Sequence, residues 1–278
     1  MYKLLATDVD GTLLDNNSKL TELNKQALLD CIACGINVII ATGKSIDSTM
    51  FIVKELKLKL PQITFGGAVL ITHERKIINF FKIPPELYLN VIGKIKERGH
   101  EPVMGTVDGK IYCQGYTKQM GYLKSVGEEI IKVDDLRSDY FKNNVVFISI
   151  PINERDPMDS FIRETYKDKL QVVRSGEYFF DILSLEASKG NALTGLIREL
   201  GIKKEEVVCF GDSPNDVSLF KASGLKIAVK NSYPELLKIA DIITEENYNH
   251  GLGRAVYKYV LKKELPIDFN KYAYGPAI

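Results

Sequence analysis

Acidic, basic and hydroxyl-bearing side chains gather at four places along the chain, each beside an apolar run or at the start of a helical pattern. These places hold Asp8 and Asp10, then Thr42, Gly43 and Lys44, then Lys189, and last Asp212, Asn215 and Asp216. Carboxylates that converge on one place repel one another unless a cation neutralises them. Because carboxylate oxygens without a nearby histidine are hard ligands, the pattern favours Mg²⁺ over zinc.

A phosphate site is predicted from the same residues. Lys189 is expected in the first turn of a helix, where free N–H groups and the helix dipole already attract anions. Mg²⁺ keeps few protein ligands and commonly binds substrate phosphate as well. With the metal and Lys189 to bind the phosphate, Asp8 has a natural role as a nucleophile toward phosphorus.

The elements that must position these side chains alternate between strand and helix at both ends of the chain. Apolar runs predict buried parallel strands over 3–10, 37–42 and 207–211. Helical patterns predict helices over 22–33, 46–57 and 188–200, with Thr21 as the cap of the first and Ser188 as the cap of the last. Such alternation indicates a parallel sheet with helices on both faces, and ligands bind outside the carboxyl ends of its strands.

The middle of the chain has a different pattern. Pro84 and Pro85 interrupt the alternation, and helical stretches then mix with strand-like runs such as VDGKIYC and NNVVFISI. Asp108 and Gly109, in the first of these runs, supply a hairpin turn signal. We therefore expect residues 83–185, called the cap below, to form an inserted α+β domain. Residues 1–82 and 186–278 are expected to form one α/β core.

These motifs resemble those of the haloacid dehalogenase-like (HAD) superfamily, in particular the Cof-type phosphatases with a type IIB cap. The runs DVDGT (8–12), ATG (41–43), SKGNAL (188–193) and GDSPND (211–216) match its four motifs in order. The resemblance implies a Rossmann-like parallel-sheet core with an inserted α+β cap. Two positions depart from the pattern: Lys44 stands where many relatives have arginine, and GGA at 66–68 where many have asparagine–glycine–alanine. Lysine lacks the bidentate phosphate contact of arginine.

The resemblance also implies a role for each acidic residue of the first and fourth motifs. Asp8 would attack phosphorus and become an aspartyl phosphate, and Asp10 would act as general acid and then general base. Mg²⁺ would be held by the Asp8 carboxylate, the Asp10 backbone carbonyl and Asp212. Asp216 would orient Lys189 or lie in the outer shell of the metal.

The phosphate-binding residues are implied in the same way. Thr42 and the Gly43 amide would bind phosphate oxygens, with Lys44 beside them. Lys189 would offset charge on the nucleophile and the phosphoryl group, and Asn215 would contact the phosphate. The implied function is Mg²⁺-dependent hydrolysis of a small phosphorylated metabolite of the sugar phosphate, pyridoxal phosphate or flavin mononucleotide class.

Two other functions on the same fold stay open: a phosphosugar mutase and a non-catalytic phosphosugar-binding regulator. A phospho-acceptor receiver domain is disfavoured because receivers are small single domains with the aspartate in mid-chain. The sequence predicts neither the oligomeric state, nor the cap residues that select the substrate, nor a role for residues 265–278.

Composition limits the kinds of binding partner that we expect. The 278 residues carry 37 lysines and arginines against 36 acidic residues, so there is no global basic field for nucleic acid. No apolar run approaches the ~18 residues of a membrane span, and no signal peptide is recognisable, so we expect a cytoplasmic protein without a membrane partner. Cys31 and Cys34 form C-x-x-C at the end of a predicted helix before Gly35, where we expect two buried, unreactive thiols.

Overall fold

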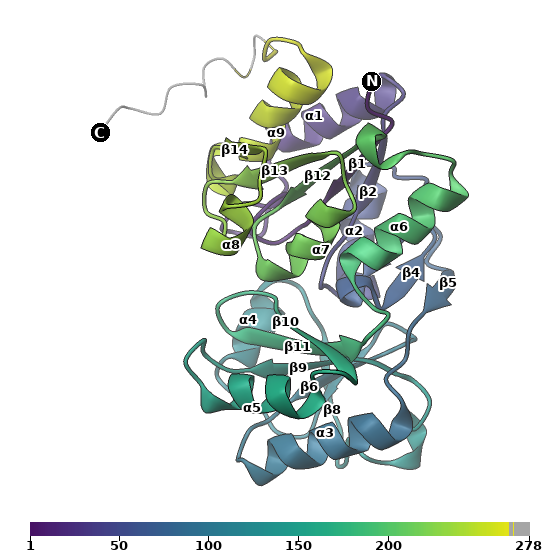
Figure 1. The fold of residues 1–278 in the computed structure, drawn as a ribbon, viewed down its shortest axis with the longest axis vertical. Helices are drawn as coiled ribbons and strands as arrows, with labels where there is room; N and C mark the ends of the chain where they lie inside the picture. Colours follow the sequence, from purple (N-terminus) through teal and green to yellow (C-terminus); the bar gives the residue numbers. More distant parts are fainter. Residues whose placement is uncertain (267–268, 270–278) are drawn as a thin grey trace.

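Segments from both ends of the chain build one parallel sheet. The computed structural model describes residues 1–266 and 269. The strands of this sheet are β1 (Leu4–Thr7), β2 (Asn37–Ile40), β12 (Val207–Gly211), β13 (Leu225–Val229) and β14 (Ile242–Thr244). Their order is β14-β13-β12-β1-β2, and each neighbouring pair is parallel. The carboxyl ends of β12, β1 and β2 therefore lie side by side along one sheet edge (Figure 1).

Helices cover both faces of this sheet (Figure 1). One face carries α1 (Glu22–Ala33), α2 (Ile46–Glu55), α9 (Gly251–Ala255) and the π-helix that follows it (Val256–Leu261). The other face carries α6 (Lys189–Glu199), α7 (Val217–Lys221) and α8 (Pro234–Leu237). Along β1, Leu5 packs with the first set, and Leu4 and Ala6 pack with the second. Because both faces are buried here, β1, β2 and β12 are largely apolar along their length.

The cap contains a second sheet, which is mainly antiparallel. Its strands are β6 (Val103–Thr106), β7 (Ile111–Cys113), β8 (Ile130–Lys132), β9 (Val145–Pro151), β10 (Leu170–Arg174) and β11 (Phe179–Ser184). They lie in the order β10-β11-β9-β6-β7-β8. The helices α3 (Pro85–Glu97) and α5 (Pro157–Tyr166) cover one face. The opposite face is turned toward the five-stranded sheet, and the short helix α4 (Met120–Ser125) lies on that side (Figure 1).

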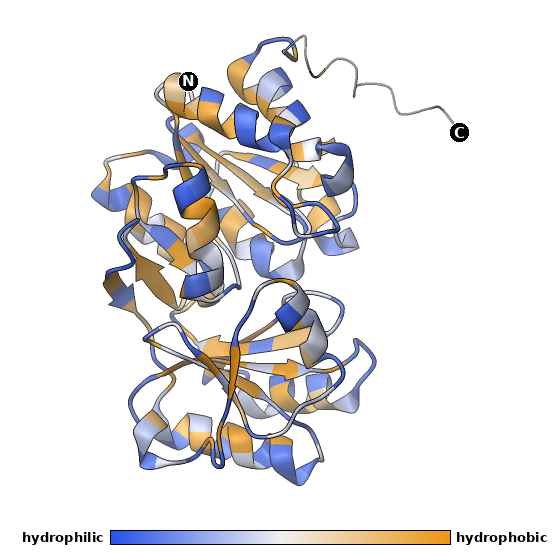
Figure 2. Ribbon diagram, turned by 180° about the vertical axis from the view of Figure 1, so that it is seen from behind, coloured by the Kyte–Doolittle hydropathy of each residue, from blue (hydrophilic) through white to orange (hydrophobic). Residues whose placement is uncertain are grey.

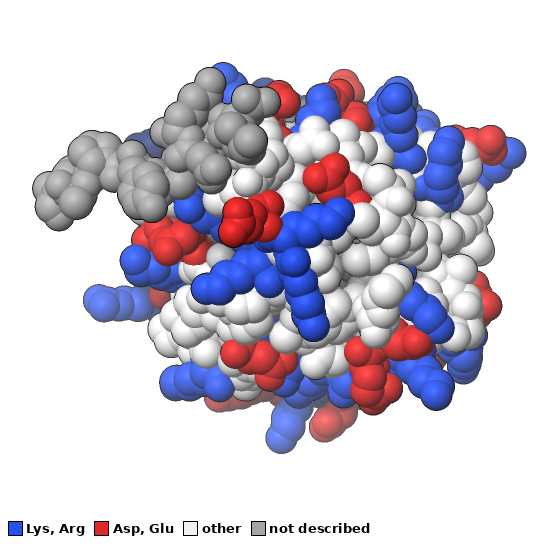
Figure 3. All heavy atoms as spheres, turned by 90° about the horizontal axis from the view of Figure 1, so that it is seen from above, with Lys and Arg blue, Asp and Glu red and all other residues white. Residues whose placement is uncertain are grey.

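A small antiparallel sheet of β3 (Gln62–Thr64), β4 (Val69–Ile71) and β5 (Ile77–Phe80) lies beside the core. Apolar residues concentrate in the strands, and polar residues on the outer sides of the helices (Figure 2). Lysine and arginine are interspersed with acidic residues on the face seen in Figure 3. Among the described residues, no helix has both the length and the apolar character needed to cross a bilayer.

The predicted fold class is confirmed. Strand β12 has the predicted bounds, α1 has the predicted span with Thr21 as its N-cap, and Asp108–Gly109 lies in the turn between β6 and β7. The cap sheet lies wholly between Val103 and Ser184, while the domain boundaries at 82/83 and 185/186 stay a prediction.

Several elements differ from the prediction. Helix α2 ends at Glu55, two residues before the predicted end at 57. Strand β5, helix α9 and its π-helical extension were not predicted. Cys31 is buried, and burial raises the pKa of its thiol to about 12, but Cys34 is exposed, so the expectation that both are buried is wrong for Cys34.

Candidate active site

Lys189 lies at the centre of a buried chain of charged groups. It is the first residue of α6, behind the N-cap Ser188, whose hydroxyl accepts a hydrogen bond from the Asn191 amide. Lys189 Nζ lies 2.6 Å from Asp8 Oδ1 and 2.6 Å from Asp216 Oδ1. The side chain of Lys189 is 1% exposed and that of Asp216 is fully buried. The ammonium group is thus fixed between two carboxylates, one of them the predicted nucleophile.

Burial and opposite charge have opposing effects on the pKa values of these buried groups. Burial alone would lower the pKa of Lys189, but the carboxylates of Asp216 and Asp8 raise it above its usual value. Burial raises the pKa of Asp8, although Lys189 acts to lower it. Burial likewise raises the pKa of Asp216 to about 6, again against the effect of Lys189. The lysine therefore stays charged.

Asp212 is held in place by two hydroxyl groups. Thr12 Oγ1 donates to Asp212 Oδ1 at 2.8 Å, and Ser213 Oγ donates to Asp212 Oδ2 at 3.0 Å. The amides of Asp212 and Ser213 both donate to Asp216 Oδ2, at 3.0 and 3.1 Å. Burial raises the pKa of Asp212 well above its usual value, and the charges of Asp8 and Asp216 raise it further.

The turn after β1 passes directly against Asp212. Gly11 has a φ of +79°, and a Cβ at this position would lie 2.6 Å from Asp212 Oδ2. Glycine satisfies both the positive φ and the close approach. The glycine of DVDGT therefore lets the first and fourth motifs lie in contact.

The acidic residues suit a hard divalent cation. Asp8, Asp212 and Asp216 each offer a carboxylate oxygen, and these oxygens lie within 4.8 Å of one another. Asp216 accepts three hydrogen bonds, from Lys189 and two backbone amides, whereas Asp212 accepts two, both from hydroxyl groups, so Asp8 and Asp212 are the better ligands. An oxygen-only donor set is typical of Mg²⁺ and Ca²⁺ sites. A divalent ion would also relieve the repulsion that raises the pKa of Asp212.

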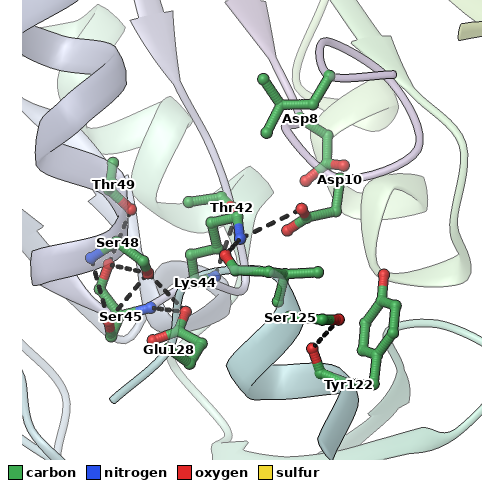
Figure 4. A network of polar contacts seen from close by, with 12 residues as sticks. Asp8, Asp10, Thr42, Lys44, Ser45, Ser48, Thr49, Tyr122, Ser125 and Glu128 are labelled. Carbon is green, nitrogen blue, oxygen red and sulfur yellow. Dashed lines mark hydrogen bonds and ion pairs between the residues drawn. The ribbon is translucent and has the colours of Figure 1, made fainter. Parts of the chain in front are cut away.

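Asp10 faces Lys44 across the same sheet edge (Figure 4). Lys44 Nζ lies 3.2 Å from Asp10 Oδ1 and also donates to the Val126 carbonyl oxygen of the cap, at 2.7 Å. Thr42 Oγ1 accepts a hydrogen bond from the Lys44 amide at 3.1 Å. Burial raises the pKa of Asp10, and Lys44 opposes that shift. A raised pKa suits a carboxyl group that donates a proton.

A cap glutamate docks on the N-terminus of α2 (Figure 4). Glu128 Oε1 accepts hydrogen bonds from the Ser45 amide at 3.0 Å and from Ser48 Oγ at 2.5 Å. Glu128 is buried, and its other oxygen has no hydrogen-bond partner among the described residues. These contacts and the Lys44–Val126 bond, together called the latch, hold the cap against the core beside Asp10.

A second close approach fixes the loop at GGA. Gly67 has a φ of +101°, and a Cβ there would lie 2.2 Å from the Ser188 backbone, at the start of α6. Gly66 has a φ of +63°, which asparagine also tolerates. The glycine at 66 in place of asparagine is therefore compatible with this backbone, whereas 67 requires glycine.

The structure brings all nine predicted site residues together. Six of them line one cavity between the core and the cap: Asp8, Asp10, Thr42, Gly43, Lys44 and Asn215. Lys189 contacts Asp8, Asp216 and Asn215, the last at 3.4 Å, and Asp212 lies beside Asp8. Whether Thr42, Gly43, Lys44 and Asn215 bind phosphate stays a prediction.

Sequence reasoning missed several residues of this site. Thr12 and Ser213 lie inside the recognised motifs, so their hydroxyl groups could have been proposed as partners of Asp212. Glu128 had no such signal, because its partners Ser45 and Ser48 lie about 80 residues away in the sequence.

Comparisons with known proteins show which family has this fold. The family model of the haloacid dehalogenase-like hydrolases matches residues 5–256. A Bacillus subtilis (strain 168) protein named "Putative phosphatase YxeH" is 30% identical over 272 residues, which covers 95% of this chain and all of the relative. The solved structure of a haloacid dehalogenase-like hydrolase from B. subtilis has a TM-score of 0.84 at 23% identity, and the match covers 92% of this chain and 99% of that one.

Two further relatives are named for a substrate. The 5-amino-6-(5-phospho-D-ribitylamino)uracil phosphatase YcsE of B. subtilis (strain 168) is 24% identical, over 93% of this chain and 96% of its own length. A phosphoglycolate phosphatase of Methanoculleus marisnigri is 26% identical, over 93% of this chain and 97% of its own length.

The fold and the site thus define a hydrolase with an α/β core and an inserted cap. The chain belongs to the haloacid dehalogenase-like hydrolases. It is an enzyme, a phosphatase, and its acidic cluster could bind the divalent metal that such phosphatases generally use.

Proposed function

We propose that this chain hydrolyses small phosphate monoesters in the presence of Mg²⁺, through an aspartyl phosphate on Asp8. The buried contact of Asp8 with Lys189 carries the proposal. An ammonium group fixed 2.6 Å from the attacking carboxylate holds the nucleophile in place. It also offsets negative charge where the phosphoryl group is transferred.

The reaction has two displacements at phosphorus. First, a carboxylate oxygen of Asp8 forms a bond to phosphorus while the bond to the leaving oxygen breaks, and Asp10 gives that oxygen its proton. Then Asp10 takes a proton from water, whose oxygen attacks the same phosphorus. The bond between phosphorus and Asp8 breaks, which releases inorganic phosphate and restores both aspartates.

The other residues bind and position. The Thr42 hydroxyl and the Gly43 amide bind phosphate oxygens, joined by the Asn215 side chain. Lys44 orients Asp10 through their 3.2 Å contact. Asp216 orients Lys189 from the side opposite Asp8.

Asp8, Asp212 and the Asp10 backbone carbonyl are the proposed ligands of Mg²⁺. All three are oxygen donors, as a hard cation prefers. When bound, the ion neutralises charge on the phosphate oxygens.

The substrates proposed are sugar phosphates, pyridoxal phosphate or flavin mononucleotide, within the cytoplasm, with no nucleic acid or membrane as partner. The substrates in the names of YcsE and the phosphoglycolate phosphatase are a phosphorylated polyol derivative with hydrogen-bond donors and a small phosphorylated acid. Residues 83–185 are proposed as the domain that selects among such molecules.

A screen of phosphate release over a panel of phosphorylated metabolites with Mg²⁺ tests the proposal, with Asp8→Asn as the inactive control. Turnover that Asp8→Asn abolishes supports it. Activity that requires a hexose bisphosphate would support the mutase instead, and binding of a phosphosugar without any turnover would support the regulator.

A further inference from the structure

The cap sheet presents a mixed face to the active-site cavity. Along β9, Ile148 and Ile150 pack against the cap helices, whereas Phe147 and Ser149 line the cavity. Along β11 the same alternation turns Asp181 toward the cavity. Two polar residues therefore stand on a face whose other positions are largely apolar.

Ser149 and Asp181 are direct partners on neighbouring strands. They lie opposite one another in the register of β9 and β11, and Ser149 Oγ donates to Asp181 Oδ1 at 2.6 Å. Asp181 is 2% exposed, and Ser175 also lines the cavity. Burial raises the pKa of Asp181 to about 6, although the hydroxyls and the charge of Lys189 oppose the shift. Burial of this carboxyl group is therefore unfavourable for folding, which favours a functional reason for its presence.

The cavity has little positive charge to offer a leaving group. Of the described residues that line it, Lys44 alone carries a positive charge, and its ammonium group is engaged by Asp10 and the Val126 carbonyl. On the cap side, Glu128 and Asp181 are acidic and the other lining residues are uncharged. Lys189 and Arg174 act on Asp181 from outside the lining, but both are already paired with other carboxylates. An anionic leaving group would thus meet like charges, whereas a hydroxyl or ammonium group would find acceptors.

We propose that Asp181, supported by Ser149, selects the leaving group of the substrate by accepting a hydrogen bond from its hydroxyl or ammonium group, and that the cavity excludes leaving groups with a carboxylate or a second phosphate. This inference rests on the proposed phosphatase function. It makes Asp181 a specificity-determining residue and places the substrate among polyol and amino-alcohol monophosphates, away from acids such as phosphoglycolate.

Three esters that differ at one carbon test this inference: glycerol 3-phosphate, 3-amino-2-hydroxypropyl phosphate and 3-phosphoglycerate. Their terminal groups are a hydroxyl, an ammonium and a carboxylate. The enzyme with Mg²⁺ is assayed for kcat/KM on each, and each is also ranked as a competitive inhibitor of p-nitrophenyl phosphate hydrolysis. The inhibition constant measures the affinity of a compound even where the enzyme binds it without hydrolysing it.

The expected order is ammonium and hydroxyl ahead of carboxylate, by roughly tenfold or more, since like charges that meet in a buried site strongly disfavour binding. Asp181→Asn keeps the shape and removes the charge, so the gap between the ammonium and carboxylate esters should shrink several-fold. Asp168→Asn, at an exposed cap position, should leave the gap unchanged.

The outcomes separate the two proposals. If the wild-type enzyme does not hydrolyse p-nitrophenyl phosphate at all, the phosphatase proposal itself is overturned. Three results would overturn only the inference about Asp181 if p-nitrophenyl phosphate is hydrolysed normally. They are a preference for 3-phosphoglycerate, no binding of any of the three esters, or a gap between the ammonium and carboxylate esters that Asp181→Asn leaves unchanged.

Discussion

The latch between the cap and α2 predicts a large effect from a residue that carries out no chemistry. Glu128 accepts two hydrogen bonds across the core–cap boundary. Hydrogen bonds to a charged group contribute about 1.5–3 kcal/mol each, and the unpartnered second oxygen of Glu128 offsets about 1–3 kcal/mol of that gain. A net stabilisation of the closed arrangement by about 2 kcal/mol corresponds to roughly 30-fold in the closure equilibrium.

We therefore expect Glu128→Ala to lower kcat/KM for a phosphate monoester roughly 30-fold, and Glu128→Gln to have a smaller effect, because the amide oxygen still accepts both hydrogen bonds. Steady-state kinetics at fixed pH and saturating Mg²⁺ measure the loss, and small-angle scattering should show a more extended molecule for Glu128→Ala. The control is Glu129→Ala, at an exposed neighbouring position. If the kcat/KM of Glu128→Ala lies within twofold of that of this control, the latch does not stabilise the closed arrangement and the reasoning is refuted.

Three further predictions concern stability and the metal. The pKa of Asp181 is about 6 in the fold against an ordinary value of 3.8, so its contribution to the free energy of unfolding falls as pH rises through this range. Asp181→Asn should therefore stabilise the protein by up to about 3 kcal/mol at pH 7 and by little near pH 4, as measured by urea titration. Equal effects at both pH values would contradict this. Gly67→Ala should destabilise by about 2 kcal/mol or more through overpacking and its positive φ, whereas Gly93→Ala, in open space on α3, should be neutral or stabilising. Chelation should abolish phosphatase activity and added Mg²⁺ should restore it, and full activity in excess chelator would exclude the metal site.

The core could be predicted because its signals are local. The strands β1, β2 and β12 lie in apolar runs, and the site residues follow those runs directly, as Asp8 follows β1 and Asp212 follows β12. Once parallel strands are inferred, topology brings the residues at their carboxyl ends together without any knowledge of side-chain contacts. A separate local signal, the capping residue Ser188, predicted Lys189 at a helix N-terminus.

The cap side of the site could not be predicted, because its contacts join residues far apart in the sequence. Glu128 meets Ser45, and Asp181 meets Ser149, only once the register of the cap sheet and its position over the core are set. A single acidic residue in a strand has no local mark that distinguishes a cavity position from an exposed one. The contact of Lys44 with a cap carbonyl likewise depends on the docked position of the cap.

The most direct test of the mechanism separates the two aspartates of the first motif by their burst kinetics. Asp8→Asn removes the attacking oxygen, so it should show no burst with p-nitrophenyl phosphate. Asp10→Asn should still form the phosphoenzyme, because p-nitrophenolate leaves without a proton, but should hydrolyse it about 10² to 10⁴ times more slowly without the base. The account predicts a burst near one p-nitrophenol per active site in Asp10→Asn. A burst in Asp8→Asn, or no burst in Asp10→Asn with equal losses for alkyl and p-nitrophenyl esters, would contradict it.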